Sequence, residues 1–280
     1  MSSLPASVHV QAKSAVIDVL KVENAFSTCE ISLWGGHVVS FIPKHDLRER
    51  LFVSEAVCFD TSRPIRGGIP ICWPWFGAHS VSGFPAHGYV RDQPWRLVKA
   101  TEGADGTTLV LMPQQANMAG FEGEAYLQLS IHVGKRLTLT LLTQNVGDQD
   151  FSYTAALHSY FSVKAVGDTE IMGITGEYLD KLDKNAQCRT PVPYTIFAET
   201  DRVHLQAASS VEICQQGVIT SIESTGHDSL VVWNPWIDKS AKMVDMNADS
   251  YQKMLCIETA VTQDQVVKAG ASHALVQSIG

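Results

Sequence analysis

Two residues of the sequence have the side chains that acid–base catalysis requires. His158 lies in an apolar and aromatic run, Tyr153-Thr-Ala-Ala-Leu-His158-Ser-Tyr-Phe161, and Glu258 lies in the strand-like segment Met254-Leu-Cys-Ile-Glu258-Thr-Ala260. A carboxylate in such a segment is rarely buried without a partner or a task, and a structural ion pair is the alternative. For His158 the alternative is a hydrogen-bonded core histidine. The two lie 100 residues apart, so only a folded sheet can bring them together.

A loop between residues 63 and 91 carries three further polar side chains, Arg66, His87 and Arg91. Its prolines remove backbone donors and its glycines permit close backbone approaches, so neither a helix nor a central strand fits this segment. Ordered loops of this kind often present functional groups over a rigid scaffold; a structural loop that plugs the end of a sheet with aromatics is the alternative. The residues concerned are Pro64, Pro70, Pro74, Pro85, Gly67, Gly68, Gly77 and Gly88.

Composition narrows the class of partner. The 280 residues are 45% hydrophobic and 18% charged, which indicates a sizeable core, and the net charge of −8 argues against binding to a nucleic acid backbone. An acidic protein that binds an anion needs a local cluster of arginines. The six cysteines form no Cys-x-x-Cys motif, and neither a signal pattern nor a membrane-spanning apolar run is present. We therefore expect a cytoplasmic protein with reduced thiols and no membrane partner.

Motifs for nucleotide and serine-hydrolase chemistry are absent. The sequence contains no Gly-x-Gly-x-x-Gly, no phosphate-loop lysine motif and no Gly-x-Ser-x-Gly. The ten histidines include no pair spaced by two or four residues, so a metal site would need ligands scattered across the fold. We therefore expect neither a cofactor nor a metal.

The elements that must position these residues are predicted to be strands. Apolar and polar residues alternate over 126–133 and 136–143, on either side of Gly134-Lys135, which predicts a hairpin. The segment 180–210 reads as a loop-like internal excursion. Short strands without a linker predict one large all-β antiparallel sandwich over residues 1–280 with few, short helices. The further strands are expected at 15–20, 29–34, 38–41, 95–98, 107–111, 151–157, 211–214, 218–223, 230–233, 254–258 and 273–277.

Seven motifs in this order resemble those of the hexose-6-phosphate mutarotases, also called glucose-6-phosphate 1-epimerases, of the aldose 1-epimerase superfamily. The resemblance runs from about residue 30 to 277. It implies a β-sandwich of the galactose-mutarotase type, no cofactor, and interconversion of the α and β anomers of an aldose phosphate. The motifs are Arg66-Gly-Gly-Ile-Pro70, Trp73-Pro-Trp-Phe-Gly77, Pro85-Ala-His87-Gly88, Arg91, Leu157-His158-Ser-Tyr-Phe161, Val232-Trp-Asn-Pro235 and Cys256-Ile-Glu258-Thr259.

The same resemblance implies roles for individual residues. His158 would be the general acid and Glu258 the general base. Arg66 and Arg91 would hold the phosphate, and His87 and Asp180 would contact the sugar. One position departs from the pattern, because Ala86 stands where some members carry an amide side chain, which removes one possible hydrogen bond to substrate.

The chemistry accounts for these residue types. Opening a pyranose takes the proton from the C1 hydroxyl while the ring oxygen receives one, so we expect two groups on opposite sides of the ring, one charged and one protonated. Two guanidinium forks suit a phosphate dianion, and Gly67 and Gly68 could add backbone N–H groups. Trp233 could stack on the sugar, as could Trp73, Trp75 and Trp236, although core packing is the commoner use of tryptophan.

Two other functions remain open from the sequence. The chain could be a mutarotase of unphosphorylated aldoses, with the arginines in structural ion pairs. It could also be a non-catalytic module that binds sugar phosphates. In each case the expected partner is a small-molecule sugar, and we expect a monomer.

Overall fold

Antiparallel strands form most of the computed structural model, which describes residues 4–206 and 208–280. The amino-terminal sheet has the order β1-β2-β3-β4. It consists of β1 (Val8–Ala12), β2 (Asp18–Glu23), β3 (Ser27–Ser32) and β4 (His37–Pro43).

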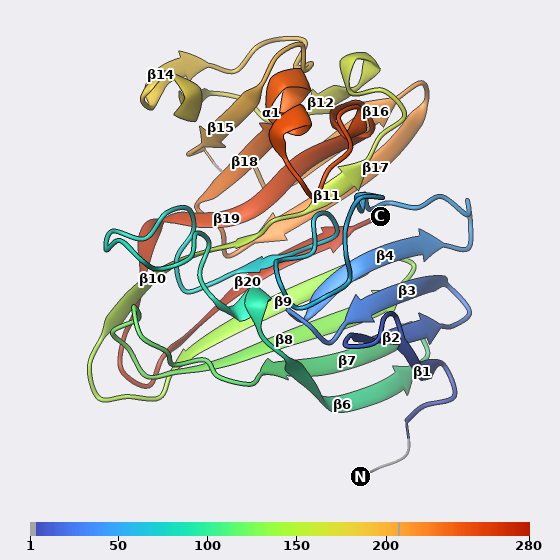
Figure 1. Cartoon of the computed structure of the whole chain (residues 1–280), viewed down its shortest axis with the longest axis vertical. Coiled ribbons are helices and arrows are strands. Elements are labelled where there is room, and N and C mark those ends of the chain that lie inside the picture. Colours follow the sequence, from blue (N-terminus) through green and yellow to red (C-terminus); the bar gives the residue numbers. More distant parts are fainter. Residues whose placement is uncertain (1–3, 207) are drawn as a thin grey trace.

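A second sheet, which we call the hairpin sheet, has the order β12-β16-β17-β20-β9-β8-β7-β6. Its strands are β6 (Trp95–Gly103), β7 (Gly106–Pro113), β8 (Ala125–Gly134), β9 (Leu137–Asn145), β12 (Glu170–Met172), β16 (Ser210–Gln215), β17 (Val218–Thr225) and β20 (Ser272–Ile279). Figure 1 shows β6 to β9 lying side by side, with the amino-terminal sheet beside them.

The third sheet, which we call the site sheet, has the order β14-β13-β15-β18-β19-β10-β5, and β11 pairs with β19 beside this path. Its strands are β5 (Ile71–Cys72), β10 (Phe151–Leu157), β11 (Tyr160–Ser162), β13 (Glu177–Asp180), β14 (Ala186–Arg189), β15 (Thr200–His204), β18 (Ser229–Asn234) and β19 (Met254–Val267). The loop 63–91 contributes only the two-residue edge strand β5, as its prolines require.

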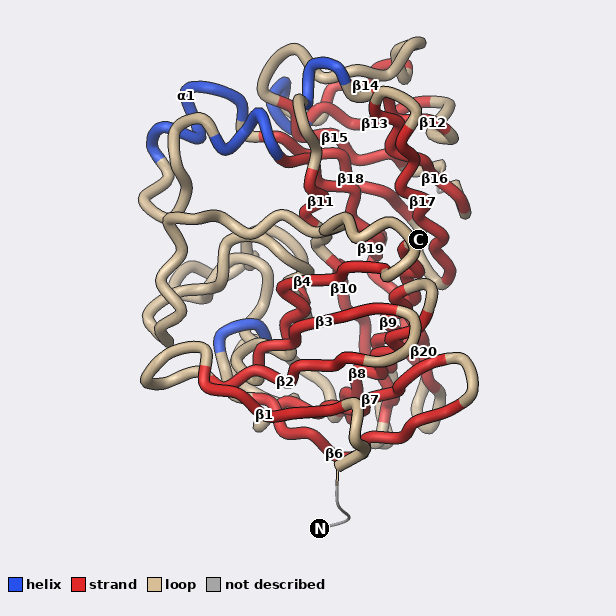
Figure 2. The backbone as a smooth tube through the Cα atoms, turned by 90° about the vertical axis from the view of Figure 1, so that its right-hand side faces the viewer, coloured by secondary structure: helices blue, strands red, loops and turns tan. Residues whose placement is uncertain are grey.

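Helical structure is sparse. Within residues 4–206 and 208–280 the one α-helix is α1 (Trp236–Lys242), and the 3₁₀ turns are η1 (Val90–Asp92), η2 (Val166–Asp168), η3 (Lys181–Asp183) and η4 (Ser250–Lys253). Figure 2 shows α1 and most loops on one side of the molecule and most of the strands on the other. None of the helices in the described part of the chain is long and apolar enough to cross a membrane.

The all-β prediction is confirmed, and the β8–β9 hairpin illustrates why it could be made. The alternating leucines of both strands are buried, with their polar neighbours on the other face. Val133 pairs with Leu137, so three residues, Gly134 to Arg136, connect the last paired residues, one more than the expected Gly134-Lys135. Period-2 alternation over eight residues is therefore a dependable signal here, while the turn position is less so.

The expectation for residues 180–210 is wrong. This segment and the residues just before it supply β13, β14 and β15, three of the seven strands on the paired path of the site sheet. These strands are only four or five residues long, and Asp, Arg, Gln and Thr occupy many of their positions. The apolar alternation that reveals a half-buried strand is therefore missing. The strand β1 was also not predicted.

One apolar cluster joins the three sheets. It contains Leu129 and Leu141 of the hairpin sheet, Val232 and Ile257 of the site sheet, and Phe41 of the amino-terminal sheet. All five side chains are fully buried. Truncating such a leucine to alanine costs about 2–5 kcal/mol, so this packing holds the site sheet firmly in place. The cluster extends from Val8 to Ile279.

A buried histidine connects β4 to the loop 63–91. The ring Nε2 of His37 donates a hydrogen bond to the Gly67 carbonyl (2.6 Å). Gly68 packs so closely that a Cβ atom there would lie 2.2 Å from the Val38 carbonyl oxygen and 2.8 Å from His37 Nε2. Burial lowers the pKa of His37 to about 4.

This histidine should make the protein sensitive to acid. Between pH 6.5 and about 4 the unfolded chain binds a proton at position 37 that the folded chain does not, so stability is lost as the pH falls. The difference corresponds to a loss on the order of 3 kcal/mol. Urea unfolding at pH 7 and pH 4.5 should show a smaller loss for His37→Gln than for the wild type. His9→Gln, a change at an exposed position, should leave the loss unchanged, and equal losses in all three proteins would contradict the assignment.

Candidate active site

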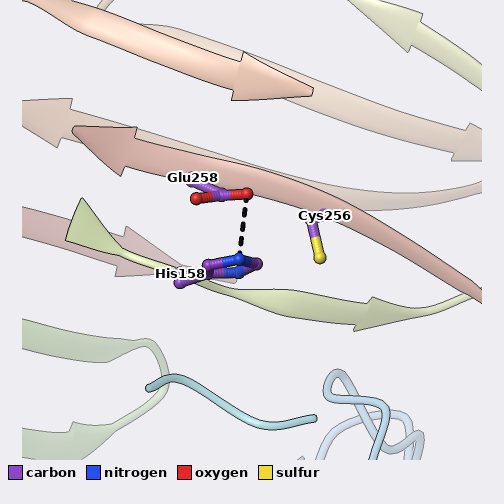
Figure 3. A group of neighbouring side chains, drawn as sticks. All are labelled: His158, Cys256 and Glu258. Carbon is purple, nitrogen blue, oxygen red and sulfur yellow. Dashed lines mark ion pairs between the residues drawn. The ribbon is translucent and has the colours of Figure 1, made fainter. Parts of the chain in front are cut away.

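The side chains of His158 and Glu258 lie in contact. The distance from His158 Nε2 to Glu258 Oε1 is 3.4 Å, and Figure 3 shows the imidazole directly facing the carboxyl group. The expected placement on opposite sides of a sugar ring is therefore wrong, because no ring fits between atoms at this distance. The two groups can instead address two oxygens bonded to one carbon. The Glu258 side chain is 1% exposed and that of His158 11%, so His158 is the member of the pair that solvent reaches.

Strand alternation explains why Glu258 points away from the core. On β19, Leu255 and Ile257 pack in the main cluster, so Cys256 and Glu258 occupy the opposite face of the sheet. Trp233 of β18 pairs with Cys256 and shares that face. We call this the site face.

Backbone hydrogen bonds fix His158 at the end of β10. Its N–H donates to the Pro70 carbonyl (3.1 Å), and the N–H of Tyr160 donates to the Gly68 carbonyl (2.9 Å). The loop 63–91 is thus joined to the histidine-bearing segment through its main chain. Beyond it, the Tyr160 ring stacks on the imidazole at 4.9 Å with an interplanar angle of 10°, which sets the ring orientation of His158.

Burial moves the pKa values of the pair in opposite directions. Desolvation and then the charge of Asp201 raise the pKa of Glu258, while Arg91 opposes this rise. Desolvation lowers the pKa of His158, and His87, Arg91 and Arg66 lower it further. Both shifts favour uncharged groups, so the pair at rest consists of a carboxylic acid and a neutral imidazole.

His87 is held as a neutral hydrogen-bond donor. The Gly77 N–H donates to its Nδ1 (3.2 Å), so the ring proton sits on Nε2. Burial, followed by the charges of Arg91, Arg66 and Lys181, lowers the pKa of His87 to about 3. The ring lies 5.7 Å from that of His158, and φ at His87 is +66°, an uncommon backbone conformation of the kind that clusters at functional sites.

The Tyr160 ring lies between the guanidinium group of Arg66 and the imidazole of His158. The Nη1 of Arg66 donates to the Tyr160 hydroxyl (3.0 Å), and its Nε and Nη2 approach Asp245 Oδ2 at 3.2 and 3.1 Å. Burial acts to lower the pKa of Arg66, but Tyr160 and Asp245 outweigh it and raise the pKa. One N–H on each terminal nitrogen is left for another acceptor, and 27% of the side chain is exposed.

Arg91 lies close enough to the pair for its charge to lower the pKa of both His158 and Glu258. Its Nη2 donates to the Ala86 carbonyl (2.9 Å), so position 86 acts through its main chain. Its Nε is buried without a partner. Glu258 Oε2 and His158 Nδ1 are likewise buried and unpartnered, so three polar atoms without protein partners lie in neighbouring residues. Unsatisfied buried groups are rare in folded proteins and call for an explanation, and a polar ligand on the site face would supply partners for these atoms.

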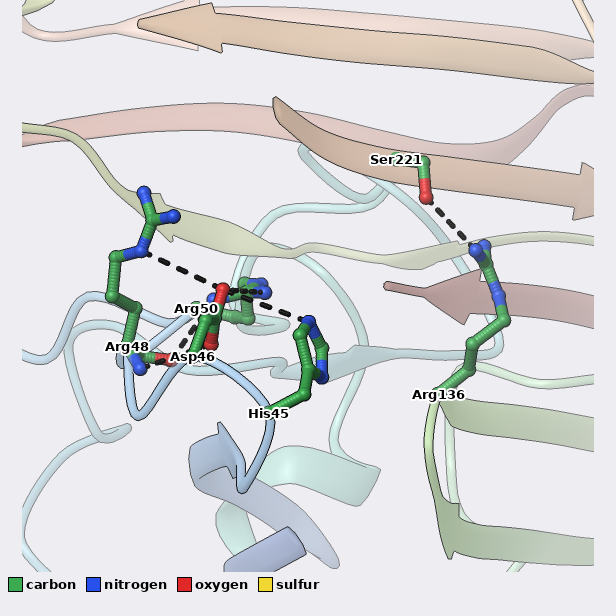
Figure 4. Close-up of polar contacts among 6 residues, drawn as sticks. All are labelled: His45, Asp46, Arg48, Arg50, Arg136 and Ser221. Carbon is green, nitrogen blue, oxygen red and sulfur yellow. Dashed lines mark hydrogen bonds and ion pairs between the residues drawn. The ribbon is translucent and has the colours of Figure 1, made fainter. Parts of the chain in front are cut away.

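Other arginines of the chain contrast with these two. Figure 4 shows Arg136 reaching Ser221; its nitrogens also donate to the Oγ and carbonyl of Ser278, which ties the β8–β9 turn to β17 and β20. In the same figure Arg50 meets Asp46, with an Nη2–Oδ2 distance of 2.7 Å. These contacts join parts of the scaffold and do not involve the site face.

Of the two remaining predicted binding residues, Trp233 lies on the site face and Asp180 does not. Trp233 lies on the site face, with its ring edge-on to His158 at 6.2 Å. The carboxylate of Asp180 instead accepts a hydrogen bond from the Leu182 N–H (2.9 Å) and caps η3. Its neighbour Leu179 packs against the site-face residue Val231, so strand alternation directs Asp180 to the opposite face.

Sequence reasoning missed Asp201, which sits on the site face. It pairs with Trp233 across β15 and β18, and the charge of Asp201 raises the pKa of Glu258. Burial raises the pKa of Asp201 itself, while Lys239 and Lys181 oppose that shift. An Asp inside Thr200-Asp-Arg-Val-His204 could have been noticed only if β15 had been recognised as a strand.

The glycines Gly67 and Gly68 serve the scaffold. The Gly68 N–H donates to the Phe52 carbonyl (2.7 Å), so the expectation that it remains free for a phosphate is wrong. At Gly67, with φ at +119°, a Cβ atom would lie 2.3 Å from the Phe52 carbonyl oxygen. Gly67 thus allows the loop to approach the chain at Phe52, and Gly68 allows it to approach Val38 and His37. Trp73 is also structural, because it is fully buried and its Nε1 donates to Thr143.

A cavity of about 930 Å³ adjoins this site, but neither His158 nor Glu258 lines it. It is lined by Trp75, His79, Tyr153 and Thr154, and shares with the site only Phe76, whose ring contacts His87 and His158. Of the residues expected to contact the sugar only Trp75 lines it, and none of the residues expected to act in catalysis or to hold the phosphate does. The paired and unpartnered titratable groups therefore locate the site at His158 and Glu258.

Comparisons with known proteins agree with this geometry. The sequence profile of the aldose 1-epimerase family matches residues 18–280. An Escherichia coli K12 protein named "Putative glucose-6-phosphate 1-epimerase" is 32% identical over 271 residues, which cover 94% of this chain and 90% of that protein. A Salmonella typhimurium LT2 protein of the same name is 32% identical over 248 residues, with coverages of 87% and 83%. The crystal structure of a Salmonella typhimurium protein described as a "putative mutarotase" superimposes with a TM-score of 0.89 at 27% identity, covering 100% of this chain and 95% of that one.

Proposed function

The chain belongs to the aldose 1-epimerase family and is therefore an isomerase of aldoses, and we propose that its substrates are hexose 6-phosphates, glucose 6-phosphate first among them. The observation that carries the proposal is the contact between His158 and Glu258 with two arginines beside it. Arg66 and Arg91 both lower the pKa of His158, so both positive charges act at the catalytic pair.

The pair provides the acid and the base of ring opening. One group takes the proton of the C1 hydroxyl and the other protonates the ring oxygen; the C1–O5 bond breaks, and an open-chain aldehyde forms. Both oxygens are bonded to C1, which is why two groups in contact can serve them. Rotation about C1–C2 and the reverse proton transfers close the ring as the other anomer. The pair shares one proton, and with that proton on either residue it always contains one acid and one base.

The phosphate supports the assignment of His158 as the acid. Arg66 lowers the pKa of His158, and a dianion bound to Arg66 cancels that effect. Binding of the dianion therefore makes transfer of the shared proton from Glu258 to His158 across the 3.4 Å contact easier, because one of the causes that lower the pKa of His158 is removed. The phosphate is carried by C6, which is attached to C5, the neighbour of the ring oxygen. If His158 protonates the ring oxygen, the phosphate therefore lies on the His158 side of the sugar. Arg66 is on that side, because it contacts the Tyr160 ring that stacks on His158.

Neighbouring side chains orient the sugar. His87 offers its Nε2–H, Asp201 offers a carboxylate that can accept from sugar hydroxyls, and Trp233 offers an aromatic edge. Asp180 caps η3, so Asp201 is the better candidate for the acidic sugar contact. We keep the expected cytoplasmic monomer and the absence of a cofactor as parts of the proposal.

A specific contact favours a second candidate. Asp245 already neutralises Arg66, as expected if this arginine is structural and the substrate is an unphosphorylated aldose. Anomer-exchange NMR with glucose 6-phosphate, galactose 6-phosphate and the free sugars separates the two. We expect faster exchange for a phosphorylated hexose. A higher kcat/KM for the neutral sugar would select the second candidate, and saturable binding without accelerated exchange would leave only a binding module.

The pH dependence should reveal the coupling of Asp201 to Glu258. The one-proton form of the pair exists between the lowered pKa of His158 and the raised pKa of Glu258, so kcat/KM should be bell-shaped with its acid limb below pH 6.5. Asp201→Asn removes a charge that raises the pKa of Glu258, so the alkaline limb should move to lower pH. Glucose is the substrate for this measurement because, unlike a sugar phosphate, it has no group that titrates near neutral pH. An unshifted alkaline limb would contradict the coupling.

A further inference from the structure

The site face holds a third potential ligand atom beside the catalytic pair. The Sγ of Cys256 and one ligand atom each of His158 and Glu258 all lie within 4.8 Å of one another. Figure 3 shows the thiol on the same side of β19 as the Glu258 carboxyl, next to the imidazole. All three residues are buried, and Cys256 plays no part in the ring-opening chemistry described above.

We propose that His158, Cys256 and Glu258 form an inhibitory site for Zn²⁺ or a similarly thiophilic divalent cation. The inhibition rests on the proposed function, because the ion would occupy the acid and the base at once. The binding itself does not depend on the identity of the substrate.

The ligand set and its spacing suit zinc. Sulfur, imidazole nitrogen and carboxylate oxygen are its usual ligands, at about 2.3, 2.0–2.1 and 2.0–2.2 Å, and tetrahedral geometry at these lengths puts the ligand atoms roughly 3.5 Å apart. The 3.4 Å contact of His158 Nε2 with Glu258 Oε1 already has this value. Thiolate and imidazole select against Mg²⁺ and Ca²⁺, which prefer oxygen ligands. The fourth position stays open to a water molecule.

The surroundings are compatible with an ion of this charge. A thiolate and a carboxylate together balance two positive charges, and binding releases the protons that both groups carry in the free protein. The other polar atoms of these two side chains, Glu258 Oε2 and His158 Nδ1, have no protein partners, so no hydrogen bond of the scaffold at those atoms holds the side chains away from an ion bound at Nε2 and Oε1. Asp201 adds a negative charge nearby, while Arg66 and Arg91 act against the ion and make the site one of moderate affinity.

Metal binding is tested without reference to catalysis. The metal-stripped full-length protein is titrated with Co²⁺, and a thiolate-to-cobalt charge-transfer band is recorded; equilibrium dialysis gives the stoichiometry for Zn²⁺. We expect one ion per chain. Cys256→Ser should abolish the band and weaken Zn²⁺ binding by at least about tenfold, the smallest loss expected even for an outer-shell partner.

Cys72→Ser is the matched control. Cys72 is also fully buried in the site sheet and lies near Glu258, but it is outside the three-residue group. This variant should keep the band and the affinity. A band that survives in Cys256→Ser, or that disappears in Cys72→Ser, would overturn the assignment, as would the absence of a band and of stoichiometric binding in the wild type.

Inhibition is tested separately by anomer exchange at micromolar Zn²⁺, with and without EDTA. We expect Zn²⁺ to slow exchange by the wild type and EDTA to restore it, whereas Cys256→Ser keeps its metal-free rate at the same Zn²⁺ concentration. Bound Zn²⁺ with an unchanged exchange rate would overturn the inhibitory role. A protein inactive on every sugar would instead refute the proposed function, while the cobalt band would still decide whether the metal site exists.

Discussion

Replacing Glu258 with Gln or His158 with Asn is expected to lower kcat for anomer exchange by about 10²–10⁴-fold, the usual contribution of a general acid or base. Each substitution preserves approximate shape but removes the ability to exchange a proton. Because the two groups share one proton across 3.4 Å, the double variant should lose little more than either single one. The measurement is NMR exchange spectroscopy on glucose 6-phosphate at its anomeric equilibrium.

Stability separates loss of chemistry from loss of fold in the same variants. Burial and Asp201 raise the pKa of Glu258 above its ordinary value of 4.5, so as the pH rises above 4.5 the unfolded chain releases a proton that the folded chain retains. The wild type therefore loses stability with rising pH at this position, and Glu258→Gln does not. We expect Glu258→Gln to melt at least as high as the wild type at pH 8 while being inactive. An active Glu258→Gln protein would rule out Glu258 as the base.

Replacing Arg66 with Ala is expected to reduce kcat/KM for glucose 6-phosphate about 10–100-fold more than kcat/KM for glucose. A hydrogen bond to a charged group contributes about 1.5–3 kcal/mol, and each 1.4 kcal/mol is about tenfold in an equilibrium constant. Arg66→Lys should recover only part of the difference, because an ammonium group cannot replace the planar fork held by Asp245. Both substrates are measured in the same exchange experiment.

A neighbouring arginine provides the control for this prediction. Arg63 lies in the same loop with the same charge but is exposed, so Arg63→Ala should change both substrates by less than about twofold, since surface substitutions rarely exceed 0.5 kcal/mol. Equal losses on glucose and glucose 6-phosphate in Arg66→Ala would instead show that Arg66 only supports Tyr160 and the stacked imidazole. That result would favour the mutarotase of neutral aldoses.

Strands whose apolar and polar residues alternate could be predicted from short stretches of the sequence. The leucines of β8 and β9 alternate because one face of each strand is buried, and that period is visible in any window of the chain. The strands β13 to β15 are short and polar, and they are held by strand pairing rather than by their own composition: β14 pairs with β13, β13 with β15, and β15 with β18. Their recognition depends on residues far away in the sequence, which is why the local pattern predicts a loop there.

The same distinction applies to the site. Composition and motifs were enough to single out His158, Glu258, Arg66, Arg91 and His87, because uncommon side chains in apolar or proline-rich segments are visible without coordinates. The choice between Asp180 and Asp201 was not visible in this way. Two aspartates on neighbouring strands differ only in the face to which the pleat directs them.

By itself, then, the sequence determined the all-β class, most strand positions and the residue types available for acid–base chemistry, because each of these is written in a few consecutive residues. Tertiary structure alone decided that the acid and the base touch at 3.4 Å, that Asp201 faces them, and that a thiol joins them. Those contacts join strands up to 100 residues apart, and their distances are set by sheet register and core packing, which no local window contains.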